Sequence, residues 1–294
     1  MGRGKELSVA CVQFTAVDGE KPQTVAKCLA LIDKAAEQGA RLVVLPEVWT
    51  GLGYSTGELY REIAEPIPGP VTEELSARAR RHGLYIVGSF YEDAGDGVYY
   101  NSAPLIDPDG RIAGVYRKTH LFDAPRRADI KGGIRESDKV RAGHDLPVFE
   151  TDFGLLGISV CSDLRFPEIY RTMTLKGARL IVCASAFLSP RIDHWEFFLR
   201  ARAAENQVFV VASGQYGTEP RSGISFVGRS MVVDPWGVIS ATAPDMECTT
   251  TTRIDLSYID EVRRRYPLLQ QRCPHLYEGI AEPGVAAEAR RQAG

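Results

Sequence analysis

Three residues of the types that carry out nucleophilic and acid–base catalysis each stand at the end of a predicted strand: Glu47, Lys118 and Cys161. A thiol such as that of Cys161 is mostly protonated at neutral pH, so it becomes a nucleophile only beside a base or a cation. A glutamate can supply the base, and a lysine can stabilise negative charge that develops on a substrate oxygen. The three positions are far apart in the chain, so only the fold could bring them together.

Each of the three residues also has an interpretation without catalysis. A glutamate after a strand is commonly a solvated loop residue or a charge near a helix N-terminus. A lysine at a strand end is commonly an exposed edge charge, and a cysteine at the end of a buried strand is commonly an inert packing residue. Residue type alone therefore leaves both interpretations open.

The N-terminal third of the chain predicts the elements around Glu47. Residues 7–14, 41–46 and 84–90 predict strands, whereas Pro22 to Gly39 and residues 71–82 predict helices. The run 41–46 is continuously apolar, which is typical of a strand covered on both faces. This alternation indicates an α/β protein in which at least part of the sheet is parallel.

The remainder of the chain predicts hairpins, a long loop and further alternation. Hairpins are predicted over residues 98–118 and 230–242, strands over 155–160, 179–184 and 207–212, and helices over 166–176 and 193–206. The tail over 260–277 is predicted to be extended or irregular. The polar stretch 123–144 shows no periodicity and predicts a loop; loops this long within compact domains are commonly functional or disordered.

The composition argues against several classes of protein. The 294 residues carry 35 Lys and Arg against 38 Asp and Glu, a formal net charge of -3, and give no electrostatic indication of a nucleic-acid partner. No apolar run approaches the roughly 18 to 20 residues that a membrane-spanning helix needs. The N-terminus lacks the apolar segment of a signal peptide. We therefore expect a soluble, cytoplasmic protein with no membrane partner.

The six cysteines are widely spread, with no C-x-x-C pair and no Cys/His cluster. This distribution predicts neither a disulfide framework nor a zinc site. Isolated cysteines of this kind are commonly small buried residues, so a catalytic role for one of them needs a further observation.

Five segments supply that observation, because together and in this order they resemble the nitrilase superfamily of carbon–nitrogen hydrolases. The resemblance runs from about Leu7 to Tyr277. The segments are Leu45-Pro46-Glu47, Tyr116-Arg117-Lys118-Thr119-His120-Leu121-Phe122, Cys161-Ser162-Asp163-Leu164-Arg165-Phe166-Pro167-Glu168, Arg200-Ala201-Arg202-Ala203-Ala204-Glu205-Asn206 and Ser230-Met231-Val232-Val233-Asp234-Pro235-Trp236-Gly237.

The resemblance implies a cofactor-free, metal-free amidohydrolase with a Glu-Lys-Cys triad. Glu47 would act as the base, Cys161 as the nucleophile that forms a thioester, and Lys118 with the backbone N–H of Ser162 would hold the oxyanion. The second glutamate of the family corresponds to Glu136, which would position substrate or assist the base; its alternative is a solvated loop residue.

Several further residues are candidates for binding substrate. Tyr54 and Trp195 are candidate pocket walls, although each could equally be a packed core aromatic. Ser162 is a further candidate, because its backbone N–H would bind the substrate oxygen. Arg165 could bind substrate or could anchor the turn after Cys161 through Glu168.

The residues after Lys118 and around Glu136 are similar to the omega-amidase and deaminated-glutathione-amidase branches. That similarity implies a dicarboxylic acid monoamide as substrate, whose carboxylate requires a cation. The candidate cations are Arg126, Arg127, Arg135 and Arg229, each of which could instead be a surface charge. Two other functions stay open: an N-carbamoyl-amino-acid hydrolase, which would release carbon dioxide as well as ammonia, and a catalytically idle scaffold.

The resemblance also implies the architecture, a four-layer αββα sandwich with mixed sheets in a single domain over residues 1–294. The C-terminal tail over residues 260–294 resembles the segment that crosses the dimer in this family. We therefore expect a homodimer, or a larger even assembly, that pairs through a helical face.

Overall fold

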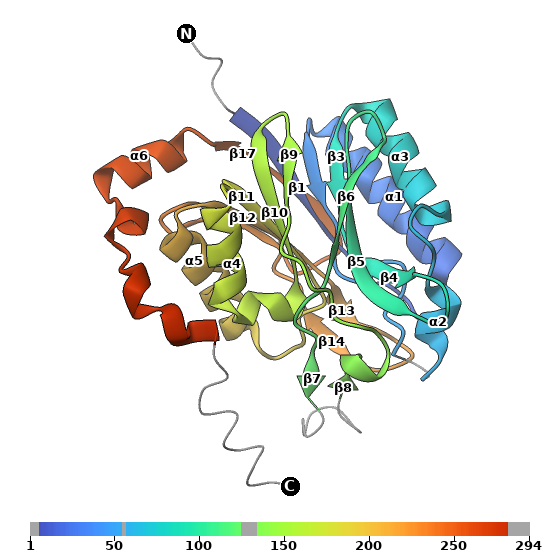
Figure 1. The fold of residues 1–294 in the computed structure, drawn as a ribbon. Helices are drawn as coiled ribbons and strands as arrows, with labels where there is room; N and C mark the ends of the chain where they lie inside the picture. Colours follow the sequence, from blue (N-terminus) through green and yellow to red (C-terminus); the bar gives the residue numbers. More distant parts are fainter. Residues whose placement is uncertain (1–5, 55–56, 125–133, 282–294) are drawn as a thin grey trace, which may run out of the picture.

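Two large β-sheets lie face to face at the centre of the molecule, and helices cover the outer face of each sheet (Figure 1). The computed structural model describes residues 6–54, 57–124 and 134–281. The part of the tail from residue 282 to 294 and the segments 55–56 and 125–133 lie outside the described residues.

The first sheet has seven strands in the order β17-β1-β2-β3-β5-β4, with β6 also paired to β5. Strands β1, β2 and β3 are parallel to one another, whereas β17, β4, β5 and β6 join by antiparallel pairing. The strands are β1 (Glu6–Gln13), β2 (Leu42–Val44), β3 (Tyr85–Val87), β4 (Phe90–Asp93), β5 (Tyr99–Ile106), β6 (Ile112–Arg117) and β17 (Cys248–Asp255).

The second sheet has six strands in the order β16-β15-β12-β11-β10-β9. Its centre, β10, β11 and β12, is parallel, and its outer strands are antiparallel. The strands are β9 (Val148–Thr151), β10 (Gly154–Val160), β11 (Leu180–Ser185), β12 (Phe209–Gly214), β15 (Met231–Val233) and β16 (Ile239–Thr242).

The helices form the two outer layers. Helices α1 (Lys21–Glu37) and α3 (Pro70–His82) cover the seven-stranded sheet, and α4 (Pro167–Leu175) and α5 (Ile192–Asn206) cover the six-stranded sheet. The remaining elements are α2 (Leu59–Ile63), α6 (Tyr258–Arg265) and the small paired strands β7 (Asp123–Ala124) with β8 (Ile134–Arg135) and β13 (Tyr216–Thr218) with β14 (Ser225–Val227). The predicted mixed α/β class is confirmed.

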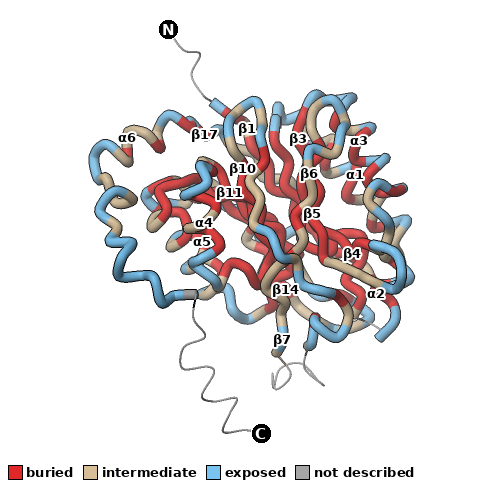
Figure 2. The backbone as a smooth tube through the Cα atoms, viewed as in Figure 1, coloured by how far each residue is buried: buried red, intermediate tan, exposed pale blue. Residues whose placement is uncertain are grey.

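The apolar side chains of the parallel strands explain why the sheets stack. Along β10 the even-numbered side chains face the other sheet, while Gly157 and Ser159 face α4. Both faces of these strands are covered, so they read as continuous apolar runs in the sequence. The buried backbone in Figure 2 follows these central strands. The residues between the sheets include Val9, Cys11, Leu42, Val44, Val87, Leu156, Ile158, Val160 and Val182.

The prediction of a single strand over residues 84–90 is wrong, because the structure has two strands there. The chain forms β3, leaves the sheet at Gly88 and Ser89, and re-enters as β4 on the far side of β5. A Cβ on Gly88 would collide with the Cβ of Leu45, so glycine lets this backbone pass close to the strand end that carries Glu47.

The prediction of an extended or irregular tail over residues 260–277 is wrong for the start of this range, where α6 forms. Ile259 and Val262 are fully buried three residues apart, so one face of this short helix packs on the core. The guanidinium of Arg179 pairs with the Asp260 carboxylate at 2.7 Å, and the three arginines 263–265 occupy the last turn, where cations favour a helix.

Candidate active site

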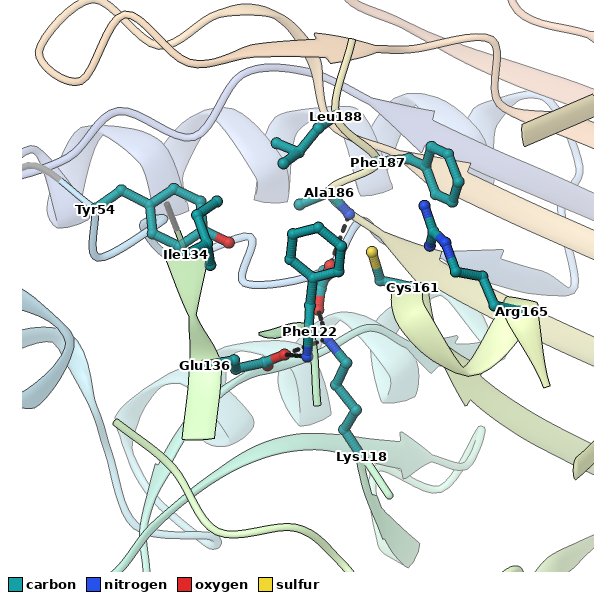
Figure 3. Close-up of a pocket in the computed structure, with 11 residues that line it drawn as sticks. Tyr54, Lys118, Phe122, Ile134, Glu136, Cys161, Arg165, Ala186, Phe187 and Leu188 are labelled. Atoms are coloured by element: carbon teal, nitrogen blue, oxygen red, sulfur yellow. Dashed lines mark hydrogen bonds and ion pairs between the residues drawn. The ribbon is translucent and has the colours of Figure 1, made fainter. Parts of the chain in front are cut away.

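The predicted catalytic residues come together where the strands of both sheets end. Glu47 lies three residues beyond β2, Cys161 directly follows β10, and Lys118 directly follows β6. Together with Glu136, which begins a short 3-10 turn, they line one cavity of about 370 Å³ measured out to its open mouth (Figure 3). Carboxyl ends of parallel strands are a common place for ligand sites in α/β proteins.

A buried lysine between two carboxylates is the main electrostatic feature of this cavity. The Nζ of Lys118 donates to Oε1 of Glu47 and to Oε2 of Glu136, both at 2.7 Å. Burial of Lys118 would lower its pKa, but the charges of Glu136 and Glu47 outweigh that effect and raise the pKa well above its usual value. Lys118 is therefore a permanent cation in the cavity.

Each of the two carboxylates is held by backbone as well as by the lysine. The N–H of Ala186, just after β11, donates to Oε2 of Glu47 at 2.8 Å. The N–H of Phe122 donates to Oε2 of Glu136 at 2.7 Å. These bonds offset the cost of removing both carboxylates from water.

Cys161 sits on a tight turn between β10 and α4. Its φ is 44°, in the left-handed region that non-glycine residues rarely occupy, and such strain clusters at functional sites. Asp163 holds this turn: its Oδ2 accepts from the N–H of Val160 at 2.8 Å and from the hydroxyl of Tyr116 at 2.7 Å. Its Oδ1 accepts from the N–H of His120 at 3.0 Å. Asp163 thus ties the turn of the thiol to the segment that carries Lys118.

The thiol of Cys161 is protonated in the resting site. Burial and the nearby negative charge of Glu47 raise its pKa well above the usual value, and the cations Lys118 and Arg165 only partly oppose this shift. A nucleophilic role consequently requires that a base remove the thiol proton as the sulfur attacks.

The candidate substrate-binding residues divide between the cavity and the core. Tyr54 and Arg165 line the cavity, and the Arg165 guanidinium lies over the ring of Phe187 at 4.3 Å from its centroid. Ser162 is buried next to Cys161 but is not among the lining residues.

The prediction of Trp195 as a pocket wall is corrected by the structure. Its side chain is fully buried on α5, and its indole N–H donates to the carbonyl of Arg229 at 2.8 Å. Its ring packs against Phe187, with ring centroids 5.3 Å apart. Trp195 therefore contacts a residue that lines the cavity without lining the cavity itself.

The four arginines proposed to meet a substrate carboxylate do not line the cavity where the structure describes them. Arg126 and Arg127 lie outside the described residues. Arg135 is exposed on β8, and Arg229 is half-buried at the end of the loop after β14. Among the described residues, Arg165 is the arginine that lines the cavity.

Sequence reasoning missed Asn101 on β5, whose Nδ2 donates to Glu47 at 2.9 Å and to Glu136 at 3.0 Å. The predicted hairpin could have indicated this residue, because it places Asn101 on the strand opposite Lys118. The backbone N–H of Lys118 donates to the carbonyl of Asn101 at 2.9 Å. The apolar cavity walls were missed as well, namely Phe122, Ile134, Ala186, Phe187 and Leu188.

Two negative findings concern the described residues only. Within the ranges 6–54, 57–124 and 134–281, no three His, Cys, Asp or Glu residues are grouped so as to hold a metal ion. In the same part of the chain, no helix combines the length and the apolar character that crossing a membrane demands.

A mixed α/β fold that places a buried thiol beside a carboxylate and an ammonium has the parts of a cysteine-dependent hydrolase. The family model for carbon–nitrogen hydrolases matches residues 8–264, and the chain belongs to this family. This confirms the resemblance found in the five sequence segments.

Relatives of known function point in the same direction. The chain is 36% identical over 260 residues to the omega-amidase NIT2 of Danio rerio, covering 87% of this chain and 91% of the relative. It is 37% identical over 283 residues to the deaminated glutathione amidase of Homo sapiens, covering 94% and 85%. The predicted resemblance to the amidase-like branch of the family is thereby confirmed.

Solved structures share the fold. The NitFhit protein of C. elegans superposes with a TM-score of 0.84 at 33% identity, covering 94% of this chain and 67% of that protein. A carbon–nitrogen hydrolase of Helicobacter pylori G27 superposes with a TM-score of 0.82 at 29% identity, covering 95% and 99%.

The raised pKa of Cys161 gives a direct prediction for thiol labelling. In the native protein at pH 7.5 we expect a neutral aromatic disulfide to modify the exposed Cys273 at least about tenfold faster than the buried Cys161. Because the thiolate fraction grows with pH up to a raised pKa, the Cys161 rate should rise steadily between pH 7 and 9. Quenching, digestion and mass spectrometry would measure both rates.

Protein unfolded in urea is the control, since both thiols should then react at similar rates. Equal rates in the native protein at pH 7.5 would contradict a protonated resting thiol.

Proposed function

We propose that this protein hydrolyses the terminal amide of a small dicarboxylic acid monoamide to the acid and ammonia, through a thioester at Cys161. The observation that carries the proposal is the single cavity lined by Cys161, Glu47, Lys118 and Glu136, with Arg165 at its wall. The similarity to omega-amidases and deaminated glutathione amidases supports the substrate class.

In the first half of the reaction, Glu47 takes the proton of Cys161 as the sulfur bonds to the amide carbon. The carbonyl oxygen becomes an oxyanion, which the third N–H of Lys118 and the backbone N–H of Ser162 stabilise. The carbon–nitrogen bond then breaks, and the proton on Glu47 passes to the leaving nitrogen. Ammonia departs and an acyl thioester remains on Cys161.

In the second half, water attacks the thioester carbon while Glu47 accepts a proton from it. The carbon–sulfur bond breaks, the acid is released, and the proton returns to the sulfur. Glu136 holds Lys118 through a second ion pair, so the ammonium stays aimed at the reacting oxygen in both halves.

Arg165 supplies the charge that a dicarboxylic acid monoamide needs at its far end. Two cations line the described cavity, Lys118 and Arg165. The Arg165 guanidinium lies over the rings of Phe187 and Phe122 at 4.3 and 5.7 Å. Apolar walls around one guanidinium suit a short carbon chain that ends in a carboxylate.

An N-carbamoyl-amino-acid hydrolase is the second candidate, because such substrates also combine an amide with a carboxylate. The two differ in products, since only the carbamoyl substrate yields carbon dioxide. A catalytically idle scaffold is the third candidate, and it would turn over neither class.

A substrate panel tests the activity. We expect ammonia from dicarboxylic acid monoamides, without carbon dioxide. The Cys161→Ala substitution should lower turnover by about 10³-fold or more, and Glu47→Gln by about 10² to 10⁴-fold, because nucleophile and base are removed. Cys28→Ala, at a buried cysteine on α1, is the matched control and should retain activity.

The same panel separates the alternatives. Carbon dioxide released with ammonia from carbamoyl amino acids would favour the second candidate, and no turnover of any compound the third. Ammonia release that survives Cys161→Ala would overturn the mechanism.

Arg165 is tested by comparing charged with uncharged amides. In Arg165→Met we expect the KM for a dicarboxylic acid monoamide to rise about 10 to 100-fold, which corresponds to loss of one charged hydrogen bond. The kinetics of a neutral aliphatic amide should change much less, and Arg165→Lys should recover part of the loss. Equal effects on both amides would show that Arg165 does not meet a carboxylate.

We also propose that the chain is one domain over residues 1–294 and pairs into a homodimer through the layer of α4 and α5 with the tail. This side of the molecule exposes large apolar side chains: Phe197 on α5 is 65% exposed, and Leu276 in the tail is 70% exposed. Apolar groups at this exposure favour a protein interface. Residues 282–294 of the proposed dimer segment lie outside the described residues.

Light scattering at micromolar concentration tests the assembly. We expect a mass of twice the 32.3 kDa chain, or a larger even multiple, and a shift toward the monomer in Phe197→Glu. Arg81→Glu on α3, in the opposite helix layer, is the control and should leave the mass unchanged. A monomeric wild-type protein would rule the proposal out.

A further inference from the structure

We infer that Asn101 is a positioning residue that fixes the Glu47 carboxylate so that its Oε2, and not its Oε1, faces Cys161. The inference deepens the proposed function, because it names the atom that would receive the thiol proton. It also assigns a role to a side chain that sequence reasoning did not identify.

Asn101 occupies the centre of the charged cluster. It is 1% exposed on β5, and its single Nδ2 donates one hydrogen to Oε1 of Glu47 and the other to Oε1 of Glu136. Its backbone carbonyl accepts a hydrogen bond from the backbone N–H of Lys118. The same residue therefore also fixes the backbone position of Lys118 relative to both carboxylates. An amide with two N–H groups is the neutral side chain suited to joining two anions.

The hydrogen bonds around Glu47 distinguish its two oxygens. Oε1 accepts from Lys118 at 2.7 Å and from Asn101 at 2.9 Å, which uses both of its lone pairs. Oε2 accepts one bond from the described residues, the N–H of Ala186. A lone pair of Oε2 is therefore left for the thiol proton, and Figure 3 shows the Cys161 sulfur pointing toward the part of the cavity where Ala186 lies.

The oxygen of the Asn101 side-chain amide supports the positioning role of this residue. The Oδ1 of Asn101 is buried and has no hydrogen-bond donor among the described residues. Turning the amide over would place this oxygen against two carboxylates, so the orientation is fixed by charge. A buried polar atom left unsatisfied is unfavourable, and such atoms are typical of sites where function requires the arrangement.

A structural role alone, in which Asn101 only stabilises the hairpin of β5 and β6, makes different predictions. The neighbouring Ser102 provides the comparison, because its hydroxyl donates to Glu92 in the ion pair that Glu92 forms with Arg117, away from the catalytic cluster. Ser102→Ala therefore perturbs the same strand without touching Glu47 or Glu136.

The experiment compares Asn101→Leu, Asn101→Ser and Ser102→Ala with the wild-type protein on a dicarboxylic acid monoamide. In Asn101→Leu we expect kcat to fall about 10 to 100-fold with KM changed less than about threefold, because a base displaced by an ångström loses its alignment. Asn101→Ser, which keeps one donor, should lie between.

Crystal structures of the same variants give a readout that does not depend on turnover. In Asn101→Leu the Glu47 carboxylate should rotate and lose the contact between its Oε2 and the N–H of Ala186, while Ser102→Ala keeps it. An unmoved carboxylate, or an equal fall of kcat in Ser102→Ala, would overturn the inference. If the wild-type protein hydrolyses no amide, the proposed function fails, and the position of the carboxylate still decides the role of Asn101.

Discussion

The ammonium of Lys118 between the carboxylates of Glu47 and Glu136 is the interaction on which the site depends. Burying three charges is expensive, and removing the ammonium would leave two uncompensated carboxylates in a medium of low polarity. The cluster persists because Asn101 and the N–H groups of Ala186 and Phe122 complete its hydrogen bonds. These partners come from β5, the end of β11 and the segment after β6, so both sheets must be in place before the cluster can form.

The thiol adds a second constraint to this charged cluster. Cys161 is held in a strained turn by Asp163, and the same carboxylate reaches back to Tyr116 and His120 beside Lys118. The nucleophile and the cation are therefore positioned by one shared group. Burial and the charge of Glu47 keep the thiol protonated at rest. In the proposed mechanism the thiol becomes a nucleophile only when Glu47 removes its proton, which suits a hydrolase that acts on a bound substrate and not on solvent species.

Much of this could be predicted from sequence, for reasons that are local. The parallel strands carry continuous apolar runs because both of their faces are covered, and the five family segments surround residues whose types suit the chemistry. The prediction of Trp195 as a pocket wall failed for another reason. Trp195 was judged by residue type, whereas its position depends on which face of α5 meets the cavity. The same holds for Arg135 and Arg229, the described candidates for a substrate-binding cation. The start of the tail is helical because Ile259 and Val262 find a core surface that no local pattern reveals.

The sequence by itself determined the family and the mixed α/β class, and it singled out Glu47, Lys118, Cys161 and Glu136 as candidate catalytic residues, since strand periodicity and motifs are encoded over a few residues. Only the tertiary structure decided that the four share a cavity, that Arg165 and not Arg135 or Arg229 lines it, and that Asn101 joins the two glutamates. The physical reason is that hydrogen bonds, burial and charge coupling act between atoms a few ångströms apart. Glu47 and Lys118 reach that distance across 71 residues through the strand pairing of the seven-stranded sheet, whereas Cys161 joins them through the stacking of the two sheets.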